Sequence, residues 1–238
     1  MPNIQLIEKT VKTDGSELDV FDIFTTIQGE GPYCGLRATF IRLAGCNLQC
    51  PQCDTDYTSK RRMMPVSDIV REVAKNGISL VVITGGEPFR QPLAKLLMEL
   101  LCIEVRVQIE TNGTLFQDLA PMTLAAITIV CAPKSGSVNK ELEKHISAWK
   151  YVIDADYVAD DGLPTQVLGR DVVKSGWERR VARPPAGFPR SQIYVQPEDP
   201  GPNAPAEQYR RNEQAAIASV MRFGYRLQLQ IHKLVGLE

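Results

Sequence analysis

Three cysteines share one short segment, Cys46-Asn-Leu-Gln-Cys50-Pro-Gln-Cys53. Thiolates this close repel one another, and a bound metal centre would remove that cost. A structural zinc site usually takes four Cys or His ligands, and no fourth Cys or His lies near these three. A four-iron cluster normally takes four thiolates, so three would leave one iron open to a ligand that is not protein. The spacing therefore indicates an iron–sulfur centre that does chemistry, rather than one that only transfers electrons.

Residues suited to ligand binding follow five of the predicted strands. They are Gly85-Gly86-Glu87, Glu110-Thr111-Asn112-Gly113, Lys134, Gln196 and His232. Parallel α/β barrels build their active sites from the loops at the carboxyl ends of the strands. The cysteine segment also follows a predicted strand, so the sequence predicts a single pocket that contains all of these residues.

The elements that must position these residues alternate along the chain. Apolar residues at every second position, or in short β-branched runs, predict strands at 20–27, 39–43, 79–84, 103–109, 125–131, 149–153, 192–195 and 225–231. Apolar residues at helical spacing predict helices at 66–75, 93–101, 139–146 and 206–223. This alternation favours an α/β fold whose parallel sheet is covered by helices. Residues 156–190, rich in Gly, Pro and charge, are interpreted as a variable insertion that forms a lid, an extra helix or a dimer contact.

The composition is that of an ordinary globular protein. Of 238 residues, 44% are hydrophobic and 23% charged, and 27 basic against 28 acidic residues give a net charge of -1. This balance argues against a nucleic-acid surface, and no apolar run is long enough to span a membrane. Six cysteines in a chain of this size, without a signal peptide, do not indicate a disulfide framework. We expect a cytoplasmic protein of one domain, residues 1–238, with no direct contact to nucleic acid or membrane.

The chain resembles the radical S-adenosylmethionine (SAM) superfamily through Cys46-x3-Cys50-x2-Cys53 and Thr84-Gly-Gly-Glu-Pro88. Within that superfamily it looks like the 7-carboxy-7-deazaguanine synthase family of queuosine-precursor biosynthesis. The segments that carry this closer resemblance are Thr26-Ile-Gln-Gly-Glu-Gly-Pro32, Phe40-Ile-Arg-Leu-Ala-Gly-Cys46, Cys53-Asp-Thr55, Ile109-Glu-Thr-Asn-Gly113, Ala132-Pro-Lys134 and the tail Ile231-His-Lys-Leu. They cover almost the whole chain in order. One departure is Ala132, where the family often has Ser.

The resemblance implies the radical SAM fold, a partial TIM-like (β/α) barrel, with a [4Fe-4S] cluster and SAM as cofactors. Cys46, Cys50 and Cys53 would bind three irons, and the amino and carboxylate groups of SAM would chelate the fourth. The residues expected to contact SAM are Gln52, Asp54, Gly85, Gly86, Glu87, Lys134, Ser135, Gln196, Pro197, Glu198 and Asp199. Thr55 corresponds to the family's ligand for Mg²⁺, an ion that prefers oxygen ligands.

The same resemblance implies the substrate 6-carboxy-5,6,7,8-tetrahydropterin and a substrate site on several strands. That site is expected to contain Ile27, Gln28, Gly29, Glu30, Arg42, Thr84, Glu110, His232 and Glu238. Glu and Gln suit the donors and acceptors of a pterin edge, and an arginine such as Arg42 suits the substrate carboxylate. The terminal carboxylate at Glu238 is expected to reach the pterin edge.

The expected reaction would make the protein a carbon–nitrogen lyase. Hydrogen abstraction at C6 of the substrate would lead to ring contraction, loss of ammonia and formation of 7-carboxy-7-deazaguanine. An electron donor such as flavodoxin is implied, and a homodimer is expected. Three alternatives stay open at this point. A glycyl-radical-activating enzyme would share the cysteine motif but would act on a protein partner. An iron–sulfur electron carrier would need a fourth cysteine, and a tRNA-binding module would need a basic surface.

Overall fold

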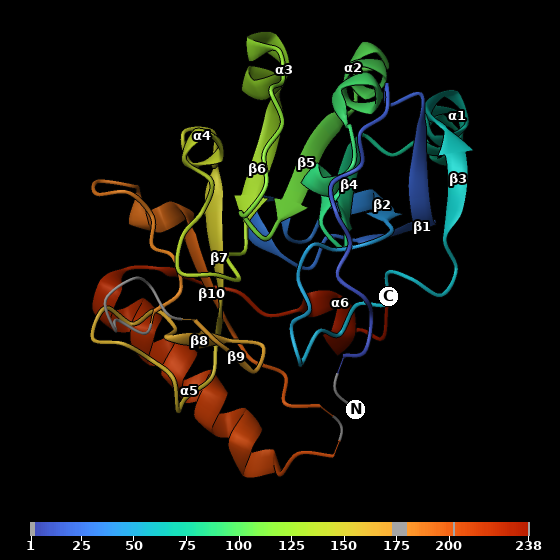
Figure 1. The fold of residues 1–238 in the computed structure, drawn as a ribbon. Coiled ribbons are helices and arrows are strands. Elements are labelled where there is room, and N and C mark those ends of the chain that lie inside the picture. The colour runs from blue at the N-terminus through green and yellow to red at the C-terminus, as the bar shows by residue number, and fades with distance from the viewer. Residues whose placement is uncertain (1–2, 173–179, 202, 238) are drawn as a thin grey trace.

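The computed structural model describes residues 3–172, 180–201 and 203–237, which form both strands and helices (Figure 1). Nine strands of this described part form one sheet in the order β11-β10-β7-β6-β5-β4-β2-β1-β3. The parallel strands are β2 (Arg37–Leu43), β4 (Leu80–Gly85), β5 (Arg106–Thr111), β6 (Ile127–Cys131), β7 (Ala148–Ile153), β10 (Ile193–Pro197) and β11 (Arg226–Leu227). β1 (Glu17–Ile27) and β3 (Arg62–Pro65) run antiparallel.

The helices are α1 (Val66–Asn76), α2 (Ala94–Cys102), α3 (Pro121–Ala126), α4 (Lys140–Glu143), α5 (Ala206–Phe223) and α6 (Ile231–Leu234). Short 3-10 turns lie at Gly31–Tyr33, Pro88–Arg90 and Arg190–Gln192. Strands β8 (Gln166–Val167) and β9 (Arg170–Asp171) form a separate antiparallel pair. Among the described residues, no helix is both long and apolar enough to cross a membrane.

The parallel strands keep their chain order across the sheet. β11 and β3 lie at the two edges, so the sheet formed by the described residues is open. A largely parallel sheet that curls without closing is consistent with a partial barrel, and it confirms the predicted α/β class. All carboxyl ends of the parallel strands therefore meet along one rim.

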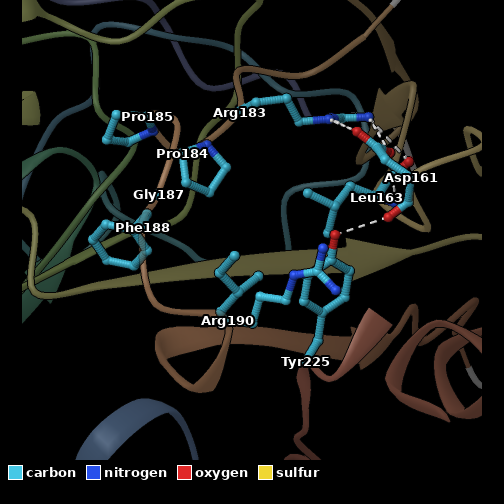
Figure 2. Close-up of a pocket in the computed structure, with 10 residues that line it drawn as sticks. Asp161, Leu163, Arg183, Pro184, Pro185, Gly187, Phe188, Arg190 and Tyr225 are labelled. Atoms are coloured by element: carbon cyan, nitrogen blue, oxygen red, sulfur yellow. Dashed lines mark hydrogen bonds and ion pairs between the residues drawn. The ribbon is translucent and has the colours of Figure 1, made fainter. Parts of the chain in front are cut away.

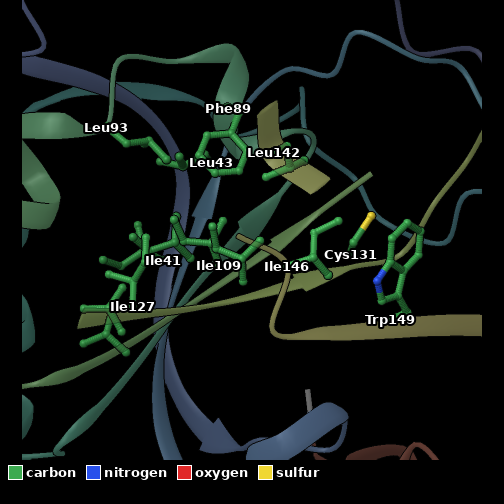
Figure 3. Packing of buried hydrophobic residues seen from close by; sticks show 14 of the residues in the cluster. Ile41, Leu43, Phe89, Leu93, Ile109, Ile127, Cys131, Leu142, Ile146 and Trp149 are labelled. Atoms are coloured by element: carbon green, nitrogen blue, oxygen red, sulfur yellow. The ribbon is translucent and has the colours of Figure 1, made fainter. Parts of the chain in front are cut away.

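The main hydrophobic core lies between the sheet and the helices that cover it (Figure 3). Alternate strand residues such as Ile41, Ile109 and Trp149 are fully buried there. Helix α1 contributes Val66, Ile69 and Val73, whose spacing places them on a single face. Each fully buried side chain of this size stabilises the fold by about 1.5–3 kcal/mol. Since every second residue of these strands is committed to this core, the residues between them face the other side of the sheet.

The predicted last strand at 225–231 is wrong beyond its first residues. β11 covers only Arg226–Leu227, and the chain then turns into α6. The Gln228 side chain points into the protein and accepts a hydrogen bond from the Gly31 amide at 2.5 Å. Leu227 and Leu229 are 43% and 40% exposed, so their alternation does not mark a buried strand face.

Two other predicted boundaries also differ. The helix predicted at 139–146 is the short α4, which Asn139 caps through its side chain to the amides of Glu141 and Leu142. The strand predicted from residue 125 begins at Ile127 because residues 121–126 form α3, with Pro121 in its first turn.

The described residues of the segment 156–190 pack against the main body. Val167, Val181 and Ala182 are buried in the main core. Arg183 holds the segment together through Asp161, at 2.7 Å, and Tyr225 donates to the Asp161 carbonyl at 2.8 Å (Figure 2). The hollow in Figure 2 is lined by none of the predicted site residues. Two predictions stay predictions: that this segment is a variable insertion or lid, and that residues 1–238 form a single domain.

Candidate active site

The cysteine loop leaves the carboxyl end of β2 and buries two of its three thiols. Cys46 and Cys50 are 8% and 7% exposed, Cys53 is half-buried, and all three are free of disulfides. Burial raises the pKa of Cys46 to about 12, and the Glu87 carboxylate and the other two thiols add to the rise. Without a bound cation the Cys46 thiol would stay protonated, so the loop gains from a metal centre that stabilises the thiolate.

The thiols fit a cluster better than a single ion. In the described ranges, no three His, Cys, Asp or Glu side chains are placed to hold one metal ion. A [4Fe-4S] cluster makes a different demand, because each thiolate binds its own iron and the sulfurs need not converge on one point. Three thiols on one partly buried loop match that donor set.

The N-terminal segment runs along the cysteine loop and holds it in place. Its backbone pairs with the loop where the Glu8 amide donates to the Cys46 carbonyl at 2.8 Å. Gln5 donates to the Thr55 carbonyl at 2.9 Å and accepts from the Tyr57 amide at 2.8 Å. Sequence reasoning missed this role, because Gln5 lies in a segment without a motif.

Gly85 and Gly86 bring the end of β4 against the cysteine loop. A Cβ atom at Gly85 would lie 2.1 Å from the Leu43 carbonyl oxygen, and one at Gly86 would lie 2.0 Å from that of Gly45. Only glycine permits this backbone contact. The two glycines therefore have a structural reason to be present, in addition to their predicted contact with SAM.

Glu87 links three segments of the rim. It is fully buried, and its carboxylate accepts hydrogen bonds from the Thr111 hydroxyl and the Asn112 amide, both at 2.7 Å, and from the Phe89 amide at 3.0 Å. Burial raises the pKa of Glu87 to about 7 against the effect of these donors. The Asn112 side chain in turn donates to Asn47, next to the first cysteine, at 3.0 Å. The motif after β4 and the motif after β5 are thus joined to the cysteine loop.

Predicted substrate residues meet on the sheet face opposite the main core. Gln28 donates to Glu110 at 3.0 Å, and Thr84 donates to the other oxygen of Glu110 at 3.4 Å. Glu30 pairs with Lys150, whose ammonium also lies 3.9 Å from Glu110. The structure therefore brings four of the predicted residues together from three segments far apart in the sequence.

Lys150 was missed by sequence reasoning. It lies between Trp149 and Tyr151, which are both buried in the main core. A charged residue within such an apolar strand is the signal that could have identified it, because alternate residues face opposite sides of a sheet.

Arg42 lies next to Thr84 in the paired strands β2 and β4. Its guanidinium sits over the ring of Phe24, 5.1 Å from the centroid. The Nε atom is buried and has no hydrogen-bond partner among the described residues. An orphaned cationic donor of this kind fits an anionic group such as a substrate carboxylate.

Helix α6 covers the rim beyond the carboxyl ends of β4 and β5 (Figure 1). A Cβ atom at Gly29 would lie 1.9 Å from His232 Nδ1, so only glycine lets this histidine pack against the loop after β1. Burial lowers the pKa of His232, although the nearby Glu30 carboxylate opposes the shift. Lys233 pairs with Asp54 at 3.4 Å and with Asp199 at 3.3 Å, which ties the helix to the cysteine loop.

The residues predicted to bind SAM lie less close to one another than the predicted substrate residues do. Lys134 donates to the Ala132 carbonyl at 3.1 Å, and burial and the nearby Lys150 ammonium lower its pKa. Ser135 donates to the Ser137 carbonyl at 2.6 Å.

The predicted SAM residues at 196–199 have hydrogen-bond partners outside the cysteine loop. Gln196, whose strand β10 ends at Pro197, accepts from Gln228. Asp199 accepts from the Tyr209 hydroxyl at 3.0 Å. Burial raises the pKa of Glu198, and the neighbouring Asp154 and Asp199 carboxylates add to the rise.

Three further predicted residues lie at the edge of the site. The Gln52 amide donates to the Leu168 carbonyl at 3.1 Å, so the β8–β9 pair touches the cysteine loop. Thr55 donates to its neighbour Asp54 at 3.4 Å. Ile27 ends β1, and Glu238 lies outside the described residues.

Comparisons with known proteins show which family the chain is similar to. A family model for the radical SAM superfamily matches residues 40–134. The 7-carboxy-7-deazaguanine synthase of Rhodospirillum rubrum is 42% identical over 231 residues, which cover 93% of each chain. That of Rickettsia prowazekii is 36% identical and covers 94% of this chain and 91% of its own. The crystal structure of QueE from Escherichia coli shares the fold, with a TM-score of 0.62 at 21% identity over 89% of this chain and 92% of that one.

Proposed function

Because the chain belongs to the 7-carboxy-7-deazaguanine synthase family of radical SAM enzymes, we propose that it converts 6-carboxy-5,6,7,8-tetrahydropterin to 7-carboxy-7-deazaguanine. The family predicted from the sequence motifs is therefore confirmed. The radical SAM superfamily implies SAM and a [4Fe-4S] cluster as cofactors. The relatives match along nearly the whole chain, so the glycyl-radical-activating alternative is not favoured.

Cys46, Cys50 and Cys53 would hold the cluster, and the loops after β4 and β5 would surround SAM. When bound, the cluster and SAM supply the one-electron chemistry that removes a hydrogen atom from the substrate. The chain supports this chemistry by packing Gly86 on the cysteine loop and by fixing the loop after β5 through Glu87. These contacts keep the rim rigid, and the burial of Cys46 and Cys50 keeps water away from the thiols.

The observation that carries the proposal is the ion-paired cluster of Glu30, Lys150 and Glu110. It lies on the sheet face opposite the main core, called the inner face below. Glu30 and Glu110 offer acceptors to the N–H groups of an aminopyrimidinone ring, while Arg42 offers an unpaired cationic donor to a carboxylate. A carboxylated pterin carries both of these groups. The substrate has the composition of the product plus ammonia, so the hydrogen atom taken from C6 has to be returned while the ring contracts and ammonia leaves.

Mg²⁺ is proposed to lie beside Thr55, where one hydroxyl and the substrate oxygens would ligate it. The proposed electron donor is a small redox protein such as flavodoxin. A homodimer and a cytoplasmic location, where thiols stay reduced, complete the proposal.

The test is anaerobic incubation of the reconstituted protein with SAM, a reductant, Mg²⁺ and the carboxytetrahydropterin, followed by mass analysis. We expect 7-carboxy-7-deazaguanine with little net loss of SAM, and no product from Cys50→Ala. Cleavage of SAM without this product would reject the pterin substrate while leaving the radical SAM assignment in place.

A further inference from the structure

Lys150 occupies the centre of the polar cluster on the inner sheet face. Its side chain is 11% exposed, and its ammonium contacts Glu30 and lies 3.9 Å from Glu110. These two carboxylates come from the loop after β1 and from β5, and they are 10% and 15% exposed. Two buried carboxylates this close to a shared point would repel one another unless a cation lay between them.

Neutral donors complete the surroundings of both carboxylates. Gln230 donates to Glu30 at 2.8 Å, while Gln28 and Gln108 each donate to Glu110 at 3.0 Å. These amides can orient a carboxylate, but they cannot neutralise its charge. Within the described residues, Lys150 is the cation in direct contact with Glu30.

We propose that Lys150 is a positioning residue that keeps Glu30 and Glu110 both ionised, so that the pocket selects a ligand edge made of adjacent N–H donors. An ionised carboxylate only accepts hydrogen bonds, whereas a protonated one presents an O–H donor. Two ionised carboxylates therefore favour an aminopyrimidinone edge, with its ring N–H beside an amino group. A protonated carboxyl at either position would instead place its O–H donor against an N–H donor of the ligand.

The charges around Lys150 support this assignment. Burial opposes ionisation of Glu30, yet the Lys150 cation holds the pKa of that carboxyl below its usual range. Burial also opposes the Lys150 cation, and Glu30 and Glu110 nevertheless raise its pKa.

Three other groups act on this lysine, namely Asp54 of the cysteine loop, Lys134 after β6 and His232 of α6. None of the three has to titrate for the inference to hold, because it concerns only the two glutamates beside Lys150.

This inference rests on the proposed function, and binding without turnover separates the two. The holoenzyme with SAM, kept anaerobic and without reductant, is titrated calorimetrically with 6-carboxy-5,6,7,8-tetrahydropterin between about pH 7 and pH 9. For Lys150→Met we expect about a 10- to 100-fold higher dissociation constant at pH 7, the effect expected when a charged hydrogen bond is lost. The ratio of variant to wild-type constants should fall as the pH rises, because the glutamate that became protonated ionises again.

Two variants separate charge from fold. Lys150→Arg keeps the cation and should restore binding to within about threefold, and Lys144→Met removes an exposed lysine elsewhere and should leave binding unchanged. If Lys150→Met does not fold, the double variant Lys150→Met with Glu30→Gln removes the unpaired charge. The double variant should bind weakly, with a ratio that does not depend on pH.

Either of two results would overturn the inference alone: wild-type affinity in the Lys150→Met or double variant, or a loss in Lys150→Met that stays constant with pH. A constant loss would be the signature of a missing contact rather than of a changed protonation state. If the wild-type protein does not bind the pterin at all, the proposed function fails and takes this inference with it.

Discussion

The backbone of Gly86 touches the cysteine loop at Gly45, so closely that a Cβ atom at residue 86 would lie 2.0 Å from the Gly45 carbonyl oxygen. The same atom would lie 3.0 Å from the Cys46 amide nitrogen. Neither neighbour is a flexible side chain that can move aside. The glycine pair after β4 therefore fixes the position of the first cluster cysteine.

Gly86→Ala should displace the cysteine loop. We expect a cost of about 1–3 kcal/mol from overpacking, with less iron and lower cluster absorbance after anaerobic reconstitution. Gly187→Ala is a control for backbone strain without a steric contact: unlike Gly86 it has a left-handed backbone (φ 84°), but its added methyl group meets nothing within 4 Å, so its iron content should stay unchanged. A Gly86→Ala protein with full iron content and unchanged stability would show that this contact does not position the loop.

The raised pKa of Glu87 predicts that the free energy of unfolding depends on pH. Its folded-state pKa of about 7 lies above the ordinary 4.5, so the folded state binds the proton more tightly than the unfolded state does. Its stabilising contribution is present below about pH 4.5 and is lost as the pH rises through 7, by up to about 3 kcal/mol. Urea unfolding of the cluster-free protein should show this fall relative to Glu87→Gln, which cannot titrate. Parallel pH profiles for the two proteins would contradict it.

The proposed role of Thr55 can be tested through the Mg²⁺ dependence of product formation. If its hydroxyl ligates Mg²⁺, Thr55→Ala should raise the Mg²⁺ concentration for half-maximal product formation by about tenfold or more, the scale seen when metal-site partners are removed. Thr55→Ser keeps the hydroxyl and should behave as the wild type. Equal Mg²⁺ dependence in all three proteins would remove Thr55 from the metal site.

The local patterns predicted most of the fold because they report burial directly. β2, β4, β5, β7 and β10 lie within a few residues of their predicted bounds, as do α1, α2 and α5. The last predicted strand failed since Leu227 and Leu229 alternate without being buried, and the inward turn of Gln228 is a tertiary contact that no local pattern encodes.

The site was predictable where motifs mark it and not where single residues complete it. The cysteine loop, the glycines at the end of β4 and Glu110 near the end of β5 lie along one rim. Lys150 and Gln5 act through contacts with distant parts of the chain: Gln5 with Thr55, 50 residues away, and Lys150 with Glu30, 120 residues away. Such partners become visible only when the chain is folded.

The most direct test of the central claim follows the hydrogen atom at C6 of the substrate. The reconstituted enzyme is given substrate that carries deuterium at C6, and the masses of SAM, 5′-deoxyadenosine and product are measured. We predict that deuterium enters the adenosyl group while 7-carboxy-7-deazaguanine forms. Product without deuterium in the adenosyl group, or SAM cleavage with all deuterium left on unchanged substrate, would contradict it.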